Sequence, residues 1–217
     1  DNYASLVRIR VPISPDYTAM NFTTGMSSKE KLIGATIQLM SARGFESMGI
    51  NSILEAADVS KSNFYYHFKS KEELCLAALD TMSDYFFANF IDPILLDIRT
   101  SPKKRLHKLI DFFKQKMIES ECSGGCPFVN LSAETSDYHP AFRERITRHY
   151  KDYADRIARC YDEGVKKGEF TDRIQPTQAA QMIMSLINGT MLMSKVQKDL
   201  SVIDMNTKTL FSLISAR

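Results

Sequence analysis

The sequence contains little of what fibrous, disordered or membrane-spanning proteins are made of. Its 217 residues include only 9 glycines and 7 prolines and no tryptophan, which excludes a collagen-like or low-complexity chain. No run approaches about 18 uninterrupted apolar residues, so no segment is expected to span a membrane. Arg8, Arg10, Pro12 and Pro15 interrupt the N-terminal segment, which argues against a signal peptide.

Cysteines are also few, and neither sign of charge dominates. Four cysteines in a chain without a recognisable export signal are expected to be reduced thiols, and the protein is expected to be cytoplasmic. The net charge of +2 neither requires nor excludes a nucleic-acid partner. With 44% hydrophobic and 25% charged residues, the chain is long enough to form one large or two small domains without disulfide bonds.

Helical periodicity begins abruptly after residue 25. Residues 1–25 show no such pattern and are interpreted as an N-terminal arm, either a mobile tail or a basic arm that contacts phosphate or a partner subunit. Ser27 and Glu30 form a capping box that starts a helix, and Gly44 is placed to end it. A shorter apolar pattern follows from residue 50 to 57, and a break at 58–60 separates it from residues 61–67. Ser70 and Glu73 form a second capping box, which opens a long helix.

The rest of the chain continues the helical pattern. Ser101 and Pro102 form an N-cap with proline at the first helical position, and Pro127, Pro140 and Pro176 open further helices. A last apolar pattern covers residues 207–215. Because no window shows strand alternation bounded by hairpin turns, we predict an all-α protein of about nine helices. We expect a DNA-binding unit at residues 26–75 and a second helical domain at residues 76–217.

The two short helices on either side of the 58–60 break have the outline of a helix-turn-helix. The segment from 61 to 74, Lys-Ser-Asn-Phe-Tyr-Tyr-His-Phe-Lys-Ser-Lys-Glu-Glu-Leu, resembles the TetR family of bacterial transcriptional regulators. That family has a recognition helix with the pattern Tyr-x-His-Phe, followed by Lys-Glu-x-Leu. The resemblance covers residues 27–75 and implies sequence-specific binding to a palindromic operator, most simply by a repressor.

Each residue of this segment has a physical reason to be there. Ser60 caps the recognition helix, Asn63 carries the donor and acceptor needed to contact adenine, and Lys71 begins the next helix as a phosphate contact. Phe64 and Phe68, four residues apart, are expected to face inward. The predicted DNA-binding residues are Ser60, Lys61, Ser62, Asn63, Tyr65, Tyr66, His67 and Lys71.

The sequence departs from the family pattern at two points. Met48 and Gly49 stand where a threonine or serine pair usually caps the second helix and contacts phosphate. Asp58 replaces the usual turn glycine, and aspartate tolerates the left-handed conformation better than most residues. Residues 26–75 contain six basic and six acidic residues, so DNA binding is expected to depend on local placement and on a second half-site contributed by a dimer.

The resemblance also implies that the C-terminal helices form an effector pocket and a dimer interface. The Pro176 helix, with Gly189 among methionines, and the last helix are predicted to form the homodimer interface, although periodicity fits an internal core helix equally well. The predicted pocket residues are Phe113, Met117, Cys122, Cys126, Phe128, Tyr150 and Tyr153, and Phe112 and Met191 belong to the same aromatic and methionine stripe.

The segment Cys122-Ser123-Gly124-Gly125-Cys126-Pro127 is the most reactive-looking part of the chain. The segment that follows, Cys126-Pro127-Phe128-Val129-Asn130-Leu131 with Glu134, resembles the TetR subgroup related to electrophile- and redox-responsive repressors. At the start of a helix the Cys126 thiol is expected to have a lowered pKa, which suits a sensor of electrophiles. The alternative is a buried cysteine that lines an apolar pocket. A metal site of Cys122, Cys126 and His139 lacks a fourth ligand and a recognised spacing.

Two other functional classes remain alternatives to a regulator. An enzyme would use Cys126 as nucleophile with His139 or His149 as base, but no nucleophile motif is present. An adaptor would use its methionine-rich face to bind other proteins. We expect no enzymatic activity, no cofactor, no metal and no membrane partner.

Overall fold

The computed structural model describes residues 26–216, so the predicted N-terminal arm lies outside the described residues. Within this range the helices are α2 (Ser28–Arg43), α3 (Ile50–Ala57), α4 (Lys61–His67), α5 (Lys71–Phe86), the π-helical turn η1 (Phe87–Ile91), α6 (Asp92–Leu95), α7 (Pro102–Glu119), α8 (Pro127–Thr135), α9 (Pro140–Lys166), α10 (Pro176–Gln197) and α11 (Ser201–Ile214). Because α5, η1 and α6 follow one another without a break, the described residues form nine continuous helices, which confirms the predicted all-α fold.

Most of the capping and turn residues identified in the sequence begin or end helices at the expected positions. Ser27 and Glu30 form the full capping box, and Gly44 ends α2 at φ 78°. Asp58 ends α3 in the left-handed conformation, at φ 51° and ψ 52°. The last helix begins at Ser201, six residues earlier than the apolar pattern predicted, because the Asp199 carboxylate accepts hydrogen bonds from the Ser201 amide and hydroxyl.

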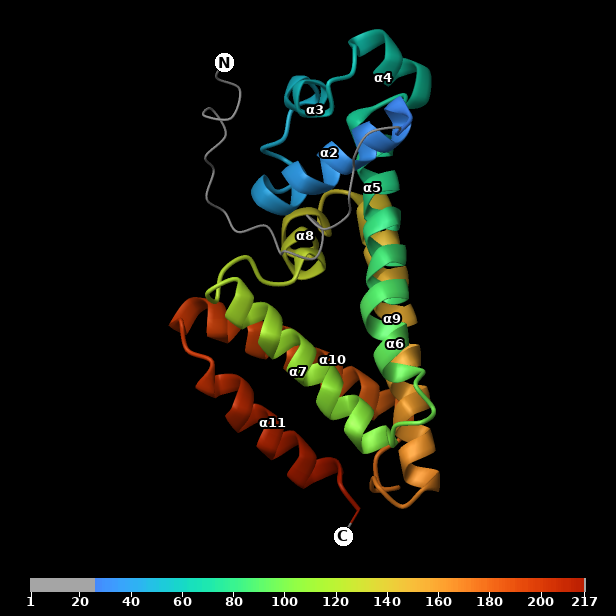
Figure 1. Ribbon diagram of the computed structural model, residues 1–217, viewed down its shortest axis with the longest axis vertical. Coiled ribbons are helices and arrows are strands. Elements are labelled where there is room, and N and C mark those ends of the chain that lie inside the picture. The colour runs from blue at the N-terminus through green and yellow to red at the C-terminus, as the bar shows by residue number, and fades with distance from the viewer. Residues whose placement is uncertain (1–25, 217) are drawn as a thin grey trace.

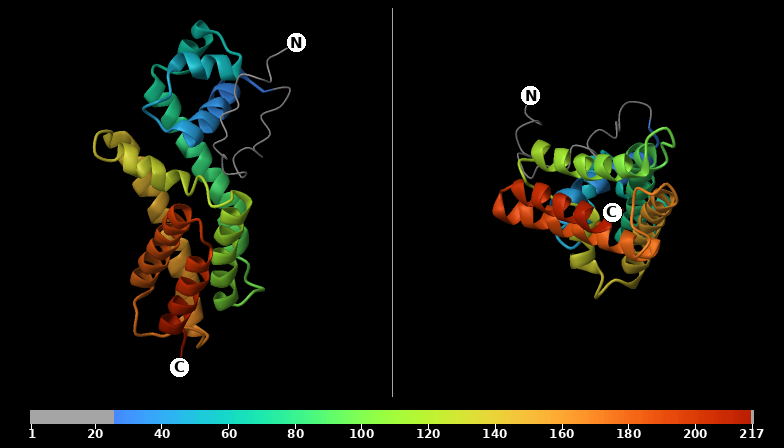
Figure 2. Two further views of the ribbon diagram at one scale, coloured as in Figure 1. Left: turned by 90° about the vertical axis from the view of Figure 1, so that its left-hand side faces the viewer. Right: turned by 90° about the horizontal axis from the view of Figure 1, so that it is seen from below.

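The helices form an elongated molecule with two parts (Figure 1). Helices α2, α3 and α4 lie at one end, and the α5–η1–α6 rod runs from this end along the C-terminal part. Helix α9 lies beside that rod, α10 packs against α7, α9 and α11, and α8 lies between the two parts (Figure 2). Residues far apart in sequence therefore meet at α8.

The core of the N-terminal part includes residues from the C-terminal part. Its buried side chains come mainly from α2 to α5, but Phe128 and Leu131 of α8 and Phe142 and Ile146 of α9 belong to the same cluster. A second cluster fills the space among α5 to α7 and α9 to α11. The position of the N-terminal helices thus depends on α8 and on the first turns of α9.

No helix within residues 26–216 is long and apolar enough to cross a membrane. The β-type backbone pairing among these residues is limited to one isolated antiparallel bridge between Phe170 and Ser215.

Candidate DNA-binding and effector sites

Helix α4 is held in place by its cap and by two buried rings. The Ser60 hydroxyl accepts a hydrogen bond from the Asn63 amide at 3.3 Å. Phe64 and Phe68 are buried in the N-terminal core, as the sequence predicted. The opposite face of a seven-residue helix is therefore left for solvent or a ligand.

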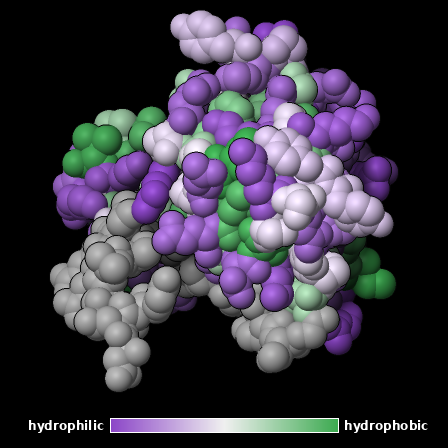
Figure 3. Space-filling model, turned by 90° about the horizontal axis from the view of Figure 1, so that it is seen from above, coloured by the Kyte–Doolittle hydropathy of each residue, from purple (hydrophilic) through white to green (hydrophobic). Residues whose placement is uncertain are grey.

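The outward face of α4 carries polar and aromatic side chains. Lys61 and Ser62 are exposed, and Tyr65 and Tyr66 are 50% and 83% exposed. The half-buried His67 ring packs edge-on against Tyr66, with 4.8 Å between the ring centroids. Seen from this end, the molecule has a mainly hydrophilic surface with scattered apolar side chains (Figure 3). This face has the donors and flat rings that contact phosphates and base edges.

Two of the predicted DNA-binding residues make contacts within the protein. The Asn63 side-chain amide donates to the Ser28 hydroxyl at 2.8 Å, so a bidentate contact with adenine requires that this bond is exchanged. The Lys71 ammonium donates to the Phe45 and Met48 carbonyls at 3.0 and 3.1 Å. It also lies 4.0 Å from the centroid of the Phe45 ring. Its predicted phosphate contact stays a prediction.

The missing cap on α3 is visible in the structure. Gly49 is the N-cap and has no side chain to accept a hydrogen bond from the first amides of the helix. Ser52 does not replace the cap, because its hydroxyl donates to the Gly49 carbonyl at 2.7 Å. The first turn of α3 therefore lacks the hydroxyl contact that the family pattern has at this place.

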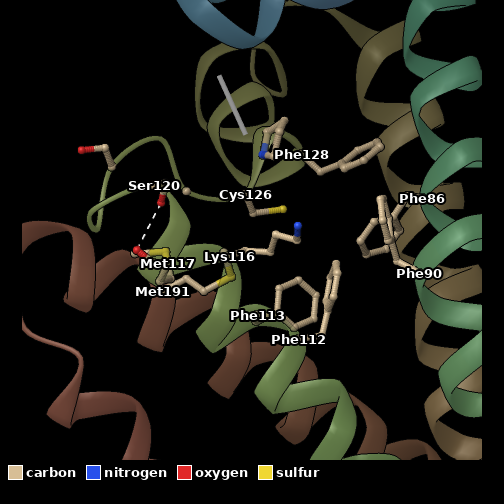
Figure 4. A pocket seen from close by; sticks show the side chains of 13 residues that line it. Phe86, Phe90, Phe112, Phe113, Lys116, Met117, Ser120, Cys126, Phe128 and Met191 are labelled. Atoms are coloured by element: carbon tan, nitrogen blue, oxygen red, sulfur yellow. Dashed lines mark hydrogen bonds between the residues drawn. The ribbon is translucent and has the colours of Figure 1, made fainter. Parts of the chain in front are cut away.

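An apolar cavity lies where α5, α7, α8 and α10 meet (Figure 4). Its free volume is about 40 Å³, which has room for about three water molecules. The sulfur of Cys126 and the rings of α5 and α7 point into it. It is lined by Phe86, Phe90, Phe112, Phe113, Lys116, Met117, Ser120, Ser123, Gly125, Cys126, Pro127, Phe128 and Met191.

Of the seven predicted pocket residues, Phe113, Met117, Cys126 and Phe128 line this cavity and three do not. Cys122 is turned into the core. Tyr153 is buried behind Phe86, with 5.7 Å between ring centroids. Tyr150 faces a separate groove between α9 and α10. Helical spacing cannot separate these positions, because a wide apolar stripe contains both cavity-lining and core residues.

Phe86, Phe90 and Lys116 also line the cavity but were not predicted. The Lys116 ammonium lies 5.9 Å from the centroid of Phe90 and 5.6 Å from that of Phe112, and it forms an ion pair with Glu119 at 2.9 Å. The i, i+4 spacing of Phe86 and Phe90 was a usable signal, since such residues share one helix face.

The predicted lowering of the Cys126 pKa is wrong. Cys126 is the N-cap residue of α8, and the amides of Phe128 and Val129 do favour its thiolate. Burial among apolar side chains outweighs them and raises the pKa of the thiol. The cost of removing the thiolate from water is larger than the stabilisation that the two backbone amides give it. Cys126 is therefore a neutral thiol at neutral pH.

The loop before Cys126 has an unusual backbone and is held by lysines. Glu121 and Cys122 have φ values of 50° and 53°, in the left-handed region that L-residues seldom adopt. The Lys198 ammonium donates to the Cys122 carbonyl at 2.8 Å, and the Lys195 ammonium donates to the Gly124 carbonyl at 3.1 Å. The last turn of α10 thus fixes one wall of the cavity.

The two histidines considered as bases have other partners. His139 Nε2 lies 2.8 Å from Glu46 Oε1, and His149 Nδ1 lies 2.8 Å from the Ser83 hydroxyl. Across residues 26–216 no group of three or more histidine, cysteine or acidic side chains is arranged to hold a metal ion.

Comparison with known proteins identifies both parts of the chain. Residues 32–78 match the family of bacterial regulatory proteins of the tetR type. Residues 102–210 match the tetracyclin repressor-like C-terminal domain.

Similar proteins of known sequence or structure cover most of the chain. An HTH-type transcriptional regulator in the lacX 3′ region of Lactococcus lactis is 31% identical over 83% of this chain and 89% of its own. The transcriptional repressor NemR of Escherichia coli is 25% identical over 82% of this chain and 89% of its own. A regulatory protein TetR from Rhodobacter sphaeroides has a crystal structure that matches with a TM-score of 0.76 and 25% identity, covering 86% of this chain and 98% of that one. The chain belongs to the TetR family of DNA-binding transcriptional regulators.

Proposed function

We propose that this protein is a homodimeric repressor that binds a palindromic operator through α4 and is released when a small molecule or electrophile occupies the aromatic cavity. The observation that carries the proposal is the arrangement of α4. Its Phe64 and Phe68 rings are buried while Lys61, Tyr65 and Tyr66 project from the end of the molecule. A rigid helix with an exposed polar and aromatic face at its leading end fits the major groove.

Apolar residues exposed on the last two helices support a dimer. On α10, Leu192, Met193 and Val196 are exposed, and on α11 Met205 and Leu213 are exposed. Gly189 lies one turn before the α10 residues on the same side, and a Cβ there would meet no other atom within 4 Å. A contiguous exposed apolar patch is typical of a subunit interface. The dimer brings two α4 helices to the two halves of a palindrome.

The side chains that line the cavity support an effector that is apolar or electrophilic. Most of its lining is aromatic or thioether, which suits a flat or apolar molecule. The Cys126 sulfur points into it, and a neutral thiol can still react with an electrophile through its minor thiolate fraction. Because the cavity has room for only about three water molecules, a larger occupant either extends through its open side or displaces part of the wall.

A selection from random duplex DNA tests the DNA-binding part of the proposal. The protein is expected to enrich a palindrome whose binding weakens as salt rises. Tyr65→Ala, which removes a 50% exposed ring, is expected to lose the enriched sequence while its thermal unfolding stays the same. Retention of the same palindrome with unchanged affinity would contradict the placement of α4 on DNA.

Alkylation tests the effector part. Protein treated with iodoacetamide, with modification of Cys126 mapped by mass spectrometry, is expected to bind the selected duplex more weakly. The Cys126→Ser variant treated in the same way serves as the control and is expected to keep its affinity. Equal losses in both proteins would place the effect at another residue.

A further inference from the structure

The side chain of Glu134, near the end of α8, contacts the DNA-binding part directly. One carboxylate oxygen accepts a hydrogen bond from the Phe45 amide at 2.9 Å, and the other accepts one from the Glu46 amide at 2.8 Å. These amides directly follow α2, 88 and 89 residues away from Glu134 in sequence. One carboxylate thus binds two successive backbone amides, and hydrogen bonds to a charged acceptor are about twice as strong as neutral ones.

The fit between this carboxylate and the loop explains the glycine at position 44. A Cβ at Gly44 would lie 2.5 Å from a Glu134 carboxylate oxygen, and the residue has φ +78°. The backbone conformation therefore requires glycine, and a Cβ at this position would push the Glu134 carboxylate aside. The loop can approach α8 this closely only without a side chain at this position.

The loop that Glu134 holds also sets the start of α3. Lys71, the first residue of α5, donates to the carbonyls of Phe45 and Met48, and Met48 immediately precedes the N-cap Gly49. The Phe45 ring packs against Phe142 of α9, with 4.6 Å between ring centroids. Residues 44–48 are therefore held by α8 on one side and by α5 and α9 on the other. Movement of α8 acts on α3 through this loop.

The other end of α8 forms a wall of the cavity. Cys126, Pro127 and Phe128 line the cavity, and Phe128 is also part of the N-terminal core. Glu134 lies seven residues after Pro127 on this helix, so about 10 Å of helical backbone connects the cavity wall to Glu134. The loop before it contains Gly124 and Gly125, both at positive φ. This loop joins the start of α8 to α7, and the Lys195 ammonium holds it through the Gly124 carbonyl.

We propose that Glu134 is the positioning residue that couples the cavity to operator binding. Its carboxylate holds residues 44–48, and through them α3 and α4, in the conformation that binds DNA. An occupant that displaces the start of α8 withdraws the carboxylate from the Phe45 and Glu46 amides and releases the loop. This inference rests on the proposed function, since it assigns the route by which an occupied cavity releases the operator.

A double-mutant cycle between the cavity and Glu134 tests the proposal. Cys126→Phe adds volume to the cavity wall, and Glu134→Gln keeps the shape of the side chain but leaves one amide facing an NH₂ group instead of an oxygen. Each single variant is expected to lower affinity for the selected duplex about tenfold, within the usual range of coupling between two sites. In the Glu134→Gln background, Cys126→Phe is expected to lower affinity less than about threefold further, because the contact it disrupts is already lost.

A control and a second measurement separate coupling from general destabilisation. Glu144→Gln breaks an exposed pair with Arg148 on α9 and is expected to leave the affinity unchanged. Amide hydrogen exchange at Phe45 and Glu46 is expected to become faster in Glu134→Gln and also in Cys126→Phe. If the cavity variant does not fold, protein alkylated by iodoacetamide at Cys126 takes its place in the cycle.

The outcomes distinguish the two proposals. If Cys126→Phe lowers affinity for the duplex by the same factor in both backgrounds, the cavity affects operator binding by a route that does not involve Glu134. The coupling proposal is then overturned, while the proposed function stands. If Cys126→Phe changes affinity for the duplex in neither background, an occupant of this cavity does not release the operator. In that case both the proposed effector site and the coupling proposal are overturned.

Discussion

The buried His149 ring is expected to make the stability of this protein depend strongly on pH. His149 is 4% exposed, and its ring stacks on Phe128 with 3.5 Å between centroids and 7° between planes. Burial, with a further contribution from the charge of Arg156, lowers its pKa from 6.5 to about 3. The folded state thus holds a neutral imidazole where the unfolded chain holds a cation at mildly acidic pH.

The sign and size of the effect follow from linkage. Between pH 6.5 and about 3 the imidazole is protonated in the unfolded state and neutral in the folded state. The free energy of unfolding therefore has its full value above pH 6.5 and decreases as the pH falls. Each pH unit below the unfolded pKa costs about 1.4 kcal/mol. At a pH about two units below the unfolded pKa the loss reaches about 3 kcal/mol per chain, a large part of the about 5–15 kcal/mol that stabilises a typical protein.

Urea unfolding at pH 7.5 and pH 4.5, at one ionic strength and one protein concentration, measures this loss. The matched variant is His149→Gln, which cannot be protonated in this range but keeps a hydrogen-bonding side chain beside Ser83. The wild type is expected to lose about 3 kcal/mol more than the variant between the two pH values, since all other titrating groups contribute equally. Equal losses in the two proteins would refute the reasoning.

Three other predictions concern a glycine, a thiol and the exposed face of α10. Gly44→Ala is expected to lower stability by about 1–3 kcal/mol, because only glycine readily adopts this backbone conformation, and to weaken operator binding by displacing Glu134; thermal unfolding and duplex titration measure both. Burial raises the pKa of the Cys126 thiol and so lowers its thiolate fraction, so iodoacetamide should modify it more slowly than free cysteine in a mass-spectrometric time course. Val196→Glu, at a position 70% exposed in the single chain, is expected to shift the protein from dimer to monomer in sedimentation at micromolar concentration, while an unchanged dimer would exclude this face from the interface.

The helices and the DNA-binding unit could be predicted because their signals are local. The capping box at Ser27 and Glu30, the N-cap at Ser60 and the left-handed Asp58 act over three or four residues. The inward orientation of Phe64 and Phe68 follows from helix periodicity in the same way. The start of α11 was predicted less well, because a capping interaction from Asp199 lies outside the apolar pattern.

The lining of the candidate effector cavity was predicted only in part, because its geometry depends on several helices at once. Phe113 and Tyr153 have the same apolar character and lie on equally regular helices, yet one lines the cavity and the other is buried behind Phe86. The pKa of Cys126 was predicted with the wrong sign, since the position at a helix start is visible in the sequence and the degree of burial is not.

The helices, their order and the outward-facing residues of α4 could thus be derived from the sequence, because each depends on neighbours within one or two helical turns. The three-dimensional packing was needed to show which side chains share the cavity, that the Cys126 thiol is neutral, and that Glu134 binds amides 88 and 89 residues away. These features arise where segments distant in sequence pack together, and packing sets the distances and desolvation on which hydrogen bonds and pKa values depend.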